Sequence, residues 1–488
     1  MSDELPKGWA TAALSQLTEN PKQDIISGPF GSNLKSDEYV SEGVPIIRLQ
    51  NVDRNKFLEK NMRFITPQKA RELSAHNFRA GDVVISKLGD PLGKACAIPE
   101  SLPHGIVVAD VVRVRIDENR FSKSYTLFAI NSPAVANQIN SEMMGSTRPR
   151  VNLNNIRDLQ IPLAPLAEQR RIVAKLEKLL GQVDACQQRL EKMPTLLKRF
   201  RQSILAAACS GRLTADWREE NSDVESARSL IERIVEVRKK SPKAQEVELI
   251  PEGESPDDIV PTSWEWVRFG SVIGELRNGV PLRPNIEPPG VPILRISAAR
   301  PGAVNLDDFR FMPDGEQFVP QFTLRDNDVI FTRYNGTIEF LGTCGMVRGL
   351  GKKTLLYPDK LMRVRFDHGS ILPAYAEVFF QAPHVHERVV ARSKSSAGQN
   401  GISGSDIKGQ PFALPPLAEQ QEIVRRVAGL FALADQLEQR LAQARKQVDK
   451  LTPSLLARAF AGQLVPQNPT DEPAEKLLER ITKQPSDS

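Results

Sequence analysis

The pentapeptide Pro165-Leu-Ala-Glu-Gln169 occurs twice in this chain, returning 251 residues later as Pro416-Leu-Ala-Glu-Gln420. Residues 165–213 align without a gap with residues 416–464, and 18 of these 49 positions are identical. The similarity extends upstream, so each copy comprises about 250 residues, far more than the repeat of a solenoid. The sequence therefore predicts a duplicated compound unit, an internal pseudo-two-fold repeat within one chain.

Each pentapeptide precedes a long amphipathic stretch. Apolar side chains recur there at alternating spacings of four and three residues, which is typical of a coiled-coil seam. In the first copy they are Ile172, Leu176, Leu179, Val183, Cys186, Leu190, Met193, Leu197 and Phe200. In the second copy they are Ile423, Val427, Leu430, Ala434, Leu437, Leu441, Ala444, Val448 and Leu451. We expect Pro194 and Pro453 to kink or break these helices, since proline lacks a backbone donor and clashes one turn back.

The segment ahead of each long helix has the pattern of a mixed α/β domain. Gly43-Val-Pro-Ile-Ile-Arg48 matches Gly290-Val-Pro-Ile-Leu-Arg295, and β-branched runs such as Val83-Val-Ile85 are bounded by turn residues. Helices are expected near 124–143 and 373–393. The predicted fold class is α+β or mixed, with two α/β domains separated by two long antiparallel coiled-coil helices. Helices of about 40 residues would be about 60 Å long.

Composition and charge narrow the class of protein. The 488 residues are 40% hydrophobic and 26% charged, with a formal net charge of +5, which describes a globular protein with a weak lean towards nucleic acid. No apolar run approaches the ~18 residues of a membrane span, and the start of the chain lacks a signal-peptide pattern. We therefore expect a cytoplasmic protein with no membrane partner. The four cysteines lie far apart without a CxxC pair, so no metal site is expected.

Sequence motifs of catalysis are missing. Gly349-Leu-Gly-Lys-Lys-Thr354 has neither the spacing nor the ending of a phosphate-binding loop, and we find no Asn/Asp-Pro-Pro-aromatic motif of amino-methyltransferases. Pro358-Asp359-Lys360 lacks a partner motif at a distance suitable for a nuclease. We therefore expect no catalytic residue. Two alternatives stay open: a chain with its own nuclease or methyltransferase activity, and a coiled-coil adaptor without a DNA role.

Tandem domains, each followed by a Pro-Leu-Ala-Glu-Gln helix, resemble the specificity subunits of type I restriction-modification enzymes. The resemblance covers nearly the whole chain, and its other specific pieces are Arg199-Phe-Arg-Gln-Ser-Ile-Leu205, Ser454-Leu-Leu-Ala457, Asn278-Gly279, Phe331-Thr-Arg-Tyr-Asn-Gly336 and Leu356-Tyr-Pro-Asp-Lys360. It implies a non-catalytic subunit that reads an asymmetric bipartite site in double-stranded DNA. It further implies two modification (methyltransferase) subunits, which carry S-adenosylmethionine and methylate adenine N6, and restriction (motor and nuclease) subunits. This chain itself would then bind no cofactor.

The resemblance also implies an order of domains. In chain order we expect a target-recognition domain at 1–160, a conserved helical region at 161–213, a linker with a short helix at 214–254, a second target-recognition domain at 255–412, a second conserved helical region at 413–464 and a C-terminal tail with a short helix at 465–488. The short helices are indicated by Leu230-Ile-Glu-Arg-Ile234, which returns as Leu477-Leu-Glu-Arg-Ile481.

Contacts to DNA favour Arg, Lys, Asn and Gln, which offer paired donors and acceptors to groove edges or positive charge to phosphates. In the first domain a basic, turn-rich loop predicts contacts from Arg148, Arg150 and Asn152, with Arg48, Gln50, Asn51 and Lys87 behind them. In the second domain the predicted contacts are Arg295, Arg333, Tyr334, Asn335 and Lys360, to which the loop 393–400 adds Lys394, Gln399 and Asn400. The arginines of Arg113-Val-Arg115 and Arg363-Val-Arg365 are expected on an exposed strand face rather than at DNA.

Overall fold

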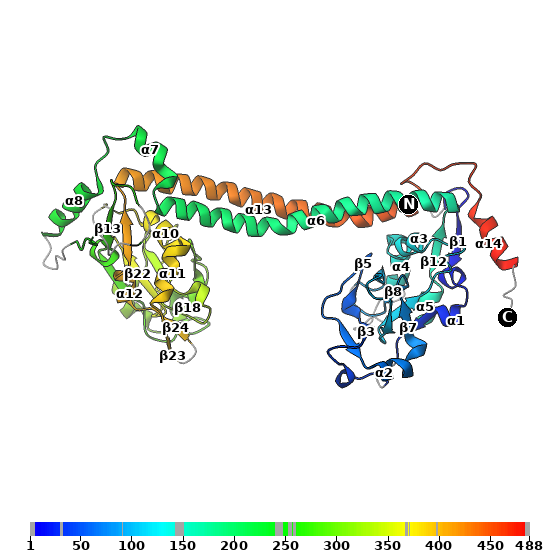
Figure 1. The fold of residues 1–488 in the computed structure, drawn as a ribbon. Helices are drawn as coiled ribbons and strands as arrows, with labels where there is room; N and C mark the ends of the chain where they lie inside the picture. Colours follow the sequence, from blue (N-terminus) through cyan, green and yellow to red (C-terminus); the bar gives the residue numbers. More distant parts are fainter. Residues whose placement is uncertain are drawn as a thin grey trace. The chain divides into compact units, whose positions relative to one another are not determined.

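The structure is a computed structural model, and it describes residues 5–29, 33–89, 91–141, 151–239, 247–251, 256, 260–366, 369, 371–396 and 399–483. The chain divides into two compact units, drawn with their elements in Figure 1. The first unit comprises residues 1–191 and 442–488, and the second comprises residues 192–441. Within the described ranges, we find no helix that is both long enough and apolar enough to cross a membrane.

The described part of the first unit contains two four-stranded sheets, ordered β6-β3-β10-β7 and β2-β11-β8-β9, and the pairs β1–β12 and β4–β5. The strands are β1 (Ala10–Ala13), β2 (Ile25–Ser27), β3 (Val44–Ile47), β4 (Val52–Asp53), β5 (Lys56–Phe57), β6 (Arg63–Ile65), β7 (Asn77–Arg79), β8 (Val83–Ser86), β9 (Ala95–Ala97), β10 (His104–Val107), β11 (Val111–Val114) and β12 (Gln160–Leu163). The shorter helices are α1 (Pro21–Asp24), α2 (Pro67–Glu72), α3 (Lys123–Ile130), α4 (Pro133–Ser141), α5 (Leu153–Arg157) and α14 (Ala474–Lys483).

The described part of the second unit has one four-stranded sheet, β14-β22-β19-β21, a three-stranded sheet, β20-β24-β23, and the pairs β13–β25, β15–β18 and β16–β17. The strands are β13 (Glu265–Arg268), β14 (Glu275–Asn278), β15 (Val291–Leu294), β16 (Ala299–Arg300), β17 (Ala303–Val304), β18 (Phe309–Met312), β19 (Val329–Thr332), β20 (Tyr334–Asn335), β21 (Cys344–Met346), β22 (Leu361–Arg365), β23 (Lys394–Ser396), β24 (Gln399–Gly401) and β25 (Pro411–Leu414). The shorter helices are α7 (Ala215–Glu220), α8 (Ala227–Lys239), α9 (Val319–Phe322), α10 (Pro373–Gln381), α11 (Pro383–Ala391) and α12 (Gly404–Lys408).

The central strands β8 and β19 are largely apolar because both of their faces are covered. Val83 and Ile85 of β8 pack into the core that also holds α3, whereas Val84 packs into a second core shared with the neighbouring sheet. In β19, Phe331 and Ile330 likewise belong to different cores. Alternate residues of a strand point to opposite faces, so an uninterrupted apolar run is buried on both.

The predicted helical segments 124–143 and 373–393 each consist of two helices. Pro133 begins α4, and Pro383 begins α11. Proline fits the first turn of a helix, where its missing N–H is not needed, whereas in a helix interior it removes a hydrogen bond and clashes one turn back. The predicted helices are therefore confirmed, with a break before each proline.

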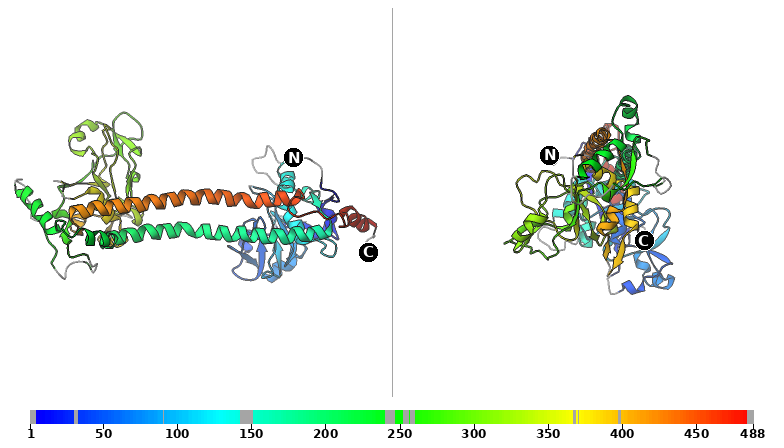
Figure 2. Two further views of the ribbon diagram at one scale, coloured as in Figure 1. Left: turned by 90° about the horizontal axis from the view of Figure 1, so that it is seen from above. Right: turned by 90° about the vertical axis from the view of Figure 1, so that its left-hand side faces the viewer.

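The long helices predicted after each pentapeptide are α6 (Leu166–Cys209) and α13 (Leu417–Phe460), each of 44 residues. They lie side by side in Figure 1 and, from above, in Figure 2. The start of α6 shares the core of the first unit with the end of α13. The end of α6 shares the core of the second unit with the start of α13. The two helices are therefore antiparallel, and the predicted fold class is confirmed.

The apolar seam departs from the prediction at three positions. Cys186, Phe200 and Leu451 are exposed, whereas Ile204 and Leu205, beyond the predicted seam, are buried. An α-helix with 3.6 residues per turn drifts by about 20° per heptad from a strict seven-residue repeat. One stripe of residues therefore does not stay in contact along the whole of a long helix.

Of the expectation that Pro194 and Pro453 kink or break the long helices, the break is wrong. α6 continues through Pro194, and α13 continues through Pro453. Pro194 leaves the carbonyl of Leu190, one turn back, without its helical donor. Arg445 of α13 donates to that oxygen through Nη2 at 3.0 Å. The neighbouring helix thus replaces the hydrogen bond that proline removes.

The arginines of β11 and β22 are not on an exposed face, so that expectation is also wrong. Arg113 and Arg363 are almost completely buried. The arginine two residues after each of them forms an ion pair with an aspartate that precedes the central strand. These ion pairs are Arg115–Asp82 at 2.8 Å and Arg365–Asp328 at 2.7 Å. The buried Arg363 itself forms an ion pair with Glu275.

The short helices predicted in the linker and the tail are α8 and α14. α8 packs on the second unit, where the N–H of Ala227 donates to the carbonyl of Ser263 at 3.1 Å. α14 packs on the first unit, where the N–H of Ala474 donates to the carbonyl of Gly8 at 2.9 Å. The repeated short helices α8 and α14 therefore each pack on one unit.

A buried contact at the start of each long helix explains the pentapeptide. Trp9 donates its indole N–H to Glu168 at 3.1 Å, and Trp264 donates to Glu419 at 2.8 Å. The glutamine after each glutamate is buried and donates to the carbonyl five residues earlier. The motif therefore joins the long helix to the first and last strands of its domain.

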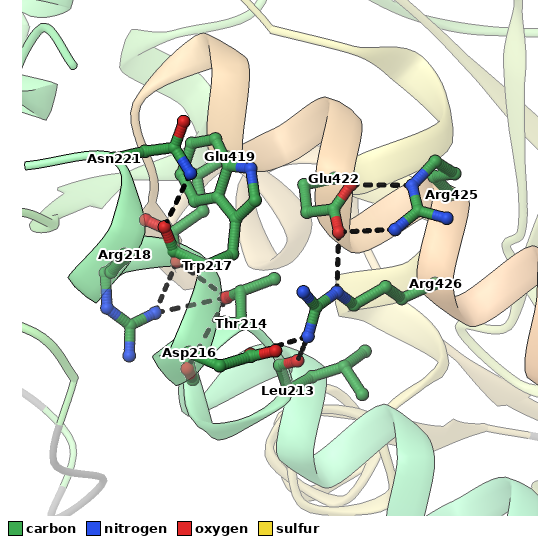
Figure 3. A network of polar contacts seen from close by, with 11 residues as sticks. Leu213, Thr214, Asp216, Trp217, Arg218, Asn221, Glu419, Glu422, Arg425 and Arg426 are labelled. Carbon is green, nitrogen blue, oxygen red and sulfur yellow. Dashed lines mark hydrogen bonds and ion pairs between the residues drawn. The ribbon is translucent and has the colours of Figure 1, made fainter.

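The two buried glutamates have different surroundings. Figure 3 shows Glu419 with Thr214, which donates at 2.7 Å, and with Arg218, which forms an ion pair with it. At Glu168 one carboxylate oxygen has no partner among the residues that the structure describes. Val465 stands at the position equivalent to Thr214, so that donor is lost. Burial raises the pKa of Glu168 above its ordinary value.

Glu419→Gln should lower the free energy of unfolding by about 1–3 kcal/mol, because Arg218 and Thr214 lose a buried ionised acceptor. Glu168→Gln is the matched variant and should leave this free energy unchanged or raise it at neutral pH. The raised pKa of Glu168 means that ionisation costs stability as pH rises above about 4.3, so the effect of Glu168→Gln should shrink in acid. Urea denaturation at about pH 7 and about pH 4 measures both. A larger loss for Glu168→Gln than for Glu419→Gln at neutral pH would contradict this assignment.

Candidate nucleic-acid interface

Two segments that are distant in sequence, β20 and the adjacent strands β23 and β24, meet in one small sheet of the second unit. β20 pairs antiparallel with β24, and β24 pairs antiparallel with β23. The register sets Asn335 opposite Asn400, and sets Tyr334 and Lys394 on either side of Gly401. Four of the predicted contact residues are therefore brought together by strand pairing.

Tyr334 is the centre of a cationic cluster, which we define as Arg333, Tyr334 and Lys360. The ring centroid of Tyr334 lies 4.8 Å from the guanidinium carbon of Arg333 and 4.6 Å from Nζ of Lys360. Cations are attracted to the electron-rich face of an aromatic ring. A glycine at 401 leaves room for the ring, because a Cβ there would lie 2.4 Å from Cε1 of Tyr334.

The backbone beneath the cationic cluster is fixed by hydrogen bonds. The N–H of Arg333 donates to the carbonyl of Lys360 at 2.8 Å, and the carbonyl of Arg333 accepts from the N–H of Ile402 at 3.0 Å. Nη1 of Arg333 donates to the carbonyl of Asp359 at 3.3 Å. These contacts hold Arg333, which follows β19, beside Lys360, which precedes β22.

A cavity of about 570 Å³ adjoins the cationic cluster. Its lining includes Arg295 and Lys360, both predicted, and Arg283 and Arg310, which were not predicted from the sequence. A smaller cavity also includes Lys360 and is lined by Tyr334. The two cavities share Ile296 and Lys360, so four predicted contacts, Arg295, Tyr334, Asn335 and Lys360, line adjoining cavities.

The charged side chains that line the larger cavity are mostly basic, four against one acidic side chain, Asp359. Arg295 also forms an ion pair with Asp308 at 3.2 Å. Such a surface attracts a polyanion. The signal for one missed residue was present in the sequence, since Arg283 stands in Pro281-Leu-Arg-Pro284, a pattern typical of a stiff exposed turn.

The predicted contacts of the first unit lie at separate places. Arg48 and Gln50 both donate to the carbonyl of Asn61, at 2.6 and 3.2 Å. Lys87 follows β8 and donates through Nζ to Oγ of Ser27 at 3.0 Å. Lys87 directly follows β8, and Arg333 directly follows β19, so the two residues occupy equivalent positions.

Asn51 has a structural role, which corrects the prediction that it contacts DNA. It is fully buried in a 3-10 turn, Leu49–Asn51. Its side-chain oxygen accepts from the N–H of Arg48 at 3.1 Å, and its Nδ2 donates to the carbonyls of Leu58 at 2.8 Å and Lys60 at 3.2 Å. The amide is used inside the domain, so we do not retain Asn51 as a DNA contact.

Three other predicted side chains are not placed. Arg148 and Arg150 lie outside the described residues, and of Gln399 only the backbone, in β24, is described. Asn152 is described and caps α5, because its side-chain oxygen accepts from the N–H of Asn155 at 2.8 Å. An N-cap asparagine stabilises its helix whether or not it also meets DNA.

In the part of the chain that the structure describes, no group of three or more His, Cys, Asp or Glu side chains is arranged to hold a metal ion. Cys96, Cys209 and Cys344 are buried, and Cys186 is exposed. Burial raises the pKa of Cys96 to about 12. The candidate interface instead offers guanidinium, ammonium, amide and phenol groups.

Comparison with known proteins identifies relatives that are named as specificity subunits of type I restriction enzymes. A family model described as the type I restriction modification DNA specificity domain matches residues 6–194. The type I restriction enzyme EcoKI specificity subunit of Escherichia coli (strain K12) is 34% identical over 494 residues, which cover 98% of this chain and 96% of that protein. The StySPI specificity subunit of Salmonella potsdam is 29% identical, with 98% and 96% covered.

Two solved structures share the fold. The HsdS subunit from Thermoanaerobacter tengcongensis has a TM-score of 0.53 and 19% sequence identity, and the match covers 94% of this chain and 98% of that one. A chain from a study of complex assembly and conformational transition of the type I R-M system has a TM-score of 0.58 and 19% identity, with 95% and 100% covered. At this identity the likeness concerns the fold alone.

Asn51→Ala should lower the free energy of unfolding by about 1–3 kcal/mol, because the carbonyls of Leu58 and Lys60 lose a donor that burial prevents water from replacing. Gln50→Ala changes the exposed neighbour and should alter stability by less than about 0.5 kcal/mol. Urea denaturation of both variants tests the assignment. Equal effects of the two substitutions would show that Asn51 does not hold this turn.

Proposed function

This chain belongs to the family of type I restriction enzyme specificity subunits, and from that premise we propose that it reads an asymmetric bipartite site in double-stranded DNA. In this proposal two modification subunits, which hold S-adenosylmethionine, methylate adenine at the site that the chain selects. Restriction subunits with motor and nuclease activity complete the enzyme. Our proposed bounds for the two readers are residues 1–160 and 255–412.

The observation that carries this proposal is that the two units repeat their scaffold but not their candidate surface. Both units have the tryptophan–glutamate contact and the arginine–aspartate ion pair on the central sheet. After the central strand, however, Arg333 and Tyr334 stand where the first unit has Lys87 and Leu88. Two readers that share a fold and differ in surface suit a target whose two halves differ.

The groups gathered on the second unit have the chemistry of a DNA reader. A guanidinium can donate two hydrogen bonds to guanine, and a carboxamide can both donate to and accept from adenine. Arg333 and Asn335 supply these groups, while exposed lysines such as Lys394 need only meet phosphates. This division predicts base readout near the cationic cluster and backbone contacts around it.

The length of the long helices supports a target in two parts. A helix of 44 residues is about 66 Å long at about 1.5 Å per residue. Half-sites read by two-fold proteins lie about 34–36 Å apart, or at multiples of that spacing. Helices of this length are long enough to separate two readers along one duplex.

We further propose that the chain has no catalytic residue and binds no cofactor itself. The support is the absence of methyltransferase and nuclease motifs from the sequence, and the naming of the relatives as specificity subunits. The competing functions are an enzyme with its own methyltransferase or nuclease activity, and a coiled-coil adaptor that does not meet DNA.

The purified chain, incubated alone with S-adenosylmethionine and plasmid DNA, should transfer no methyl groups, because the modification subunit holds the methyl donor. Adding modification subunits should give adenine methylation at one bipartite sequence, which single-molecule sequencing identifies. Methyl transfer by the lone chain would favour the enzyme alternative. Site-specific methylation by modification subunits without this chain would favour the adaptor.

Arg333→Ala should weaken binding to one half-site by about 1–3 kcal/mol and relax the base preference there, because a base contact is lost. Lys394→Ala is the matched variant and should weaken binding to all sequences alike, with the salt dependence reduced by about one phosphate contact. Titrations of the assembled complex against half-site variants at several salt concentrations separate the two effects. If Arg333→Ala left the affinity for every half-site variant unchanged, Arg333 would not contact a base.

A further inference from the structure

The loop formed by residues 279–290 exposes two large apolar side chains, of which Leu282 lines the larger cavity. Leu282 is 54% exposed, and Ile286 is 74% exposed. Apolar surface left in water costs roughly 25 cal/mol per Å². Neighbouring exposed apolar groups rimmed by polar ones mark a surface that another molecule covers.

The turn that carries Leu282, residues 280–285, is held in place at both of its ends. The N–H of Val280 donates to the carbonyl of Tyr357 at 2.8 Å, and the side chain of Val280 is buried. Asn285 and Phe311 exchange two backbone hydrogen bonds, at 2.8 and 3.0 Å. Prolines before and after the Leu-Arg dipeptide at the tip restrict its backbone. The exposed leucine is therefore presented by a fixed turn.

The surroundings of Leu282 identify the kind of partner. Leu282 lines the same cavity as Arg283, Arg295, Arg310 and Lys360. A partner must therefore offer negative charge around an apolar centre. A DNA duplex does so where a base step opens, because phosphates flank the exposed faces of the bases.

We propose that Leu282 enters a base step of the half-site bound by the second unit and partly unstacks it. Arg283 and Lys360 meet the phosphates on either side. Apolar wedges of this kind enter from the minor groove and kink the duplex. The cost of the kink depends on the sequence, so the second unit gains specificity where it makes no hydrogen bond to a base. This inference rests on the proposed function.

The test uses the full chain assembled with its modification subunits, and duplexes that carry 2-aminopurine at one position at a time in the second half-site. Because 2-aminopurine brightens when it unstacks, the parent complex should raise its fluorescence at one step. The methylated adenine is left out, since base flipping raises the signal there independently. Leu282→Ala should abolish the rise and weaken specific binding about ten-fold. Leu282→Met keeps a long apolar side chain and should retain both.

Ile338→Ala is the matched control, because Ile338 is 48% exposed in the same unit but does not line this cavity. It should change neither readout. Two outcomes would contradict the insertion of Leu282 and leave the proposed function intact. In one, the parent complex binds its site without a rise in fluorescence. In the other, the Leu282→Ala complex keeps the rise. Weaker binding of modification subunits by Leu282→Ala, with unstacking unchanged, also contradicts the insertion and indicates a protein contact. Failure of the parent complex to bind any specific sequence refutes the proposed function itself.

Discussion

The buried hydrogen bond from a tryptophan to the glutamate at the start of each long helix holds each unit together. Trp9 precedes the first strand of its domain and Glu168 follows the last, and these two strands pair with each other. Trp264 and Glu419 repeat this arrangement. The contact joins the start of the long helix to the paired first and last strands of the domain. The domain therefore fixes where its long helix begins. Burying a carboxylate costs free energy, and hydrogen-bond donors such as the indole N–H offset that cost.

Both units have the tryptophan–glutamate contact, but the residues around that contact differ between the units. Thr214 and Arg218 surround Glu419 with donors, whereas the equivalent segment near Glu168 supplies none of these contacts. The candidate interface differs further between the units, because Lys87 and Leu88 follow β8 where Arg333 and Tyr334 follow β19. Packing constrains the shared core in both units, while surface residues can change without loss of fold. In the proposed function, this difference at the surface gives one chain two different DNA-reading domains.

The sequence was sufficient to predict the duplication, the long helices and the α/β character of the domains, because each depends on a period within one segment. It could not predict contacts between distant segments. Pro194 is tolerated because Arg445, from the other long helix, satisfies the carbonyl that proline leaves unpaired. Arg113 is a charged residue between valines yet is buried, and Asn51 donates to carbonyls that only a turn brings near. Likewise, the cluster around Tyr334 forms only once the strand register is set.

The methylation pattern produced by residues 1–240 with the modification subunit tests most directly whether the chain is a pair of readers joined as a pseudo-dimer. The first unit needs residues 442–488, and residues 191–237 of a second copy are their equivalents at the 251-residue offset. Two fragments should therefore complete one another, since an uncovered apolar seam is unfavourable in water. We expect methylation at an inverted repeat of one half-site of the full chain's target. Methylation at the original asymmetric sequence would contradict the pseudo-dimer.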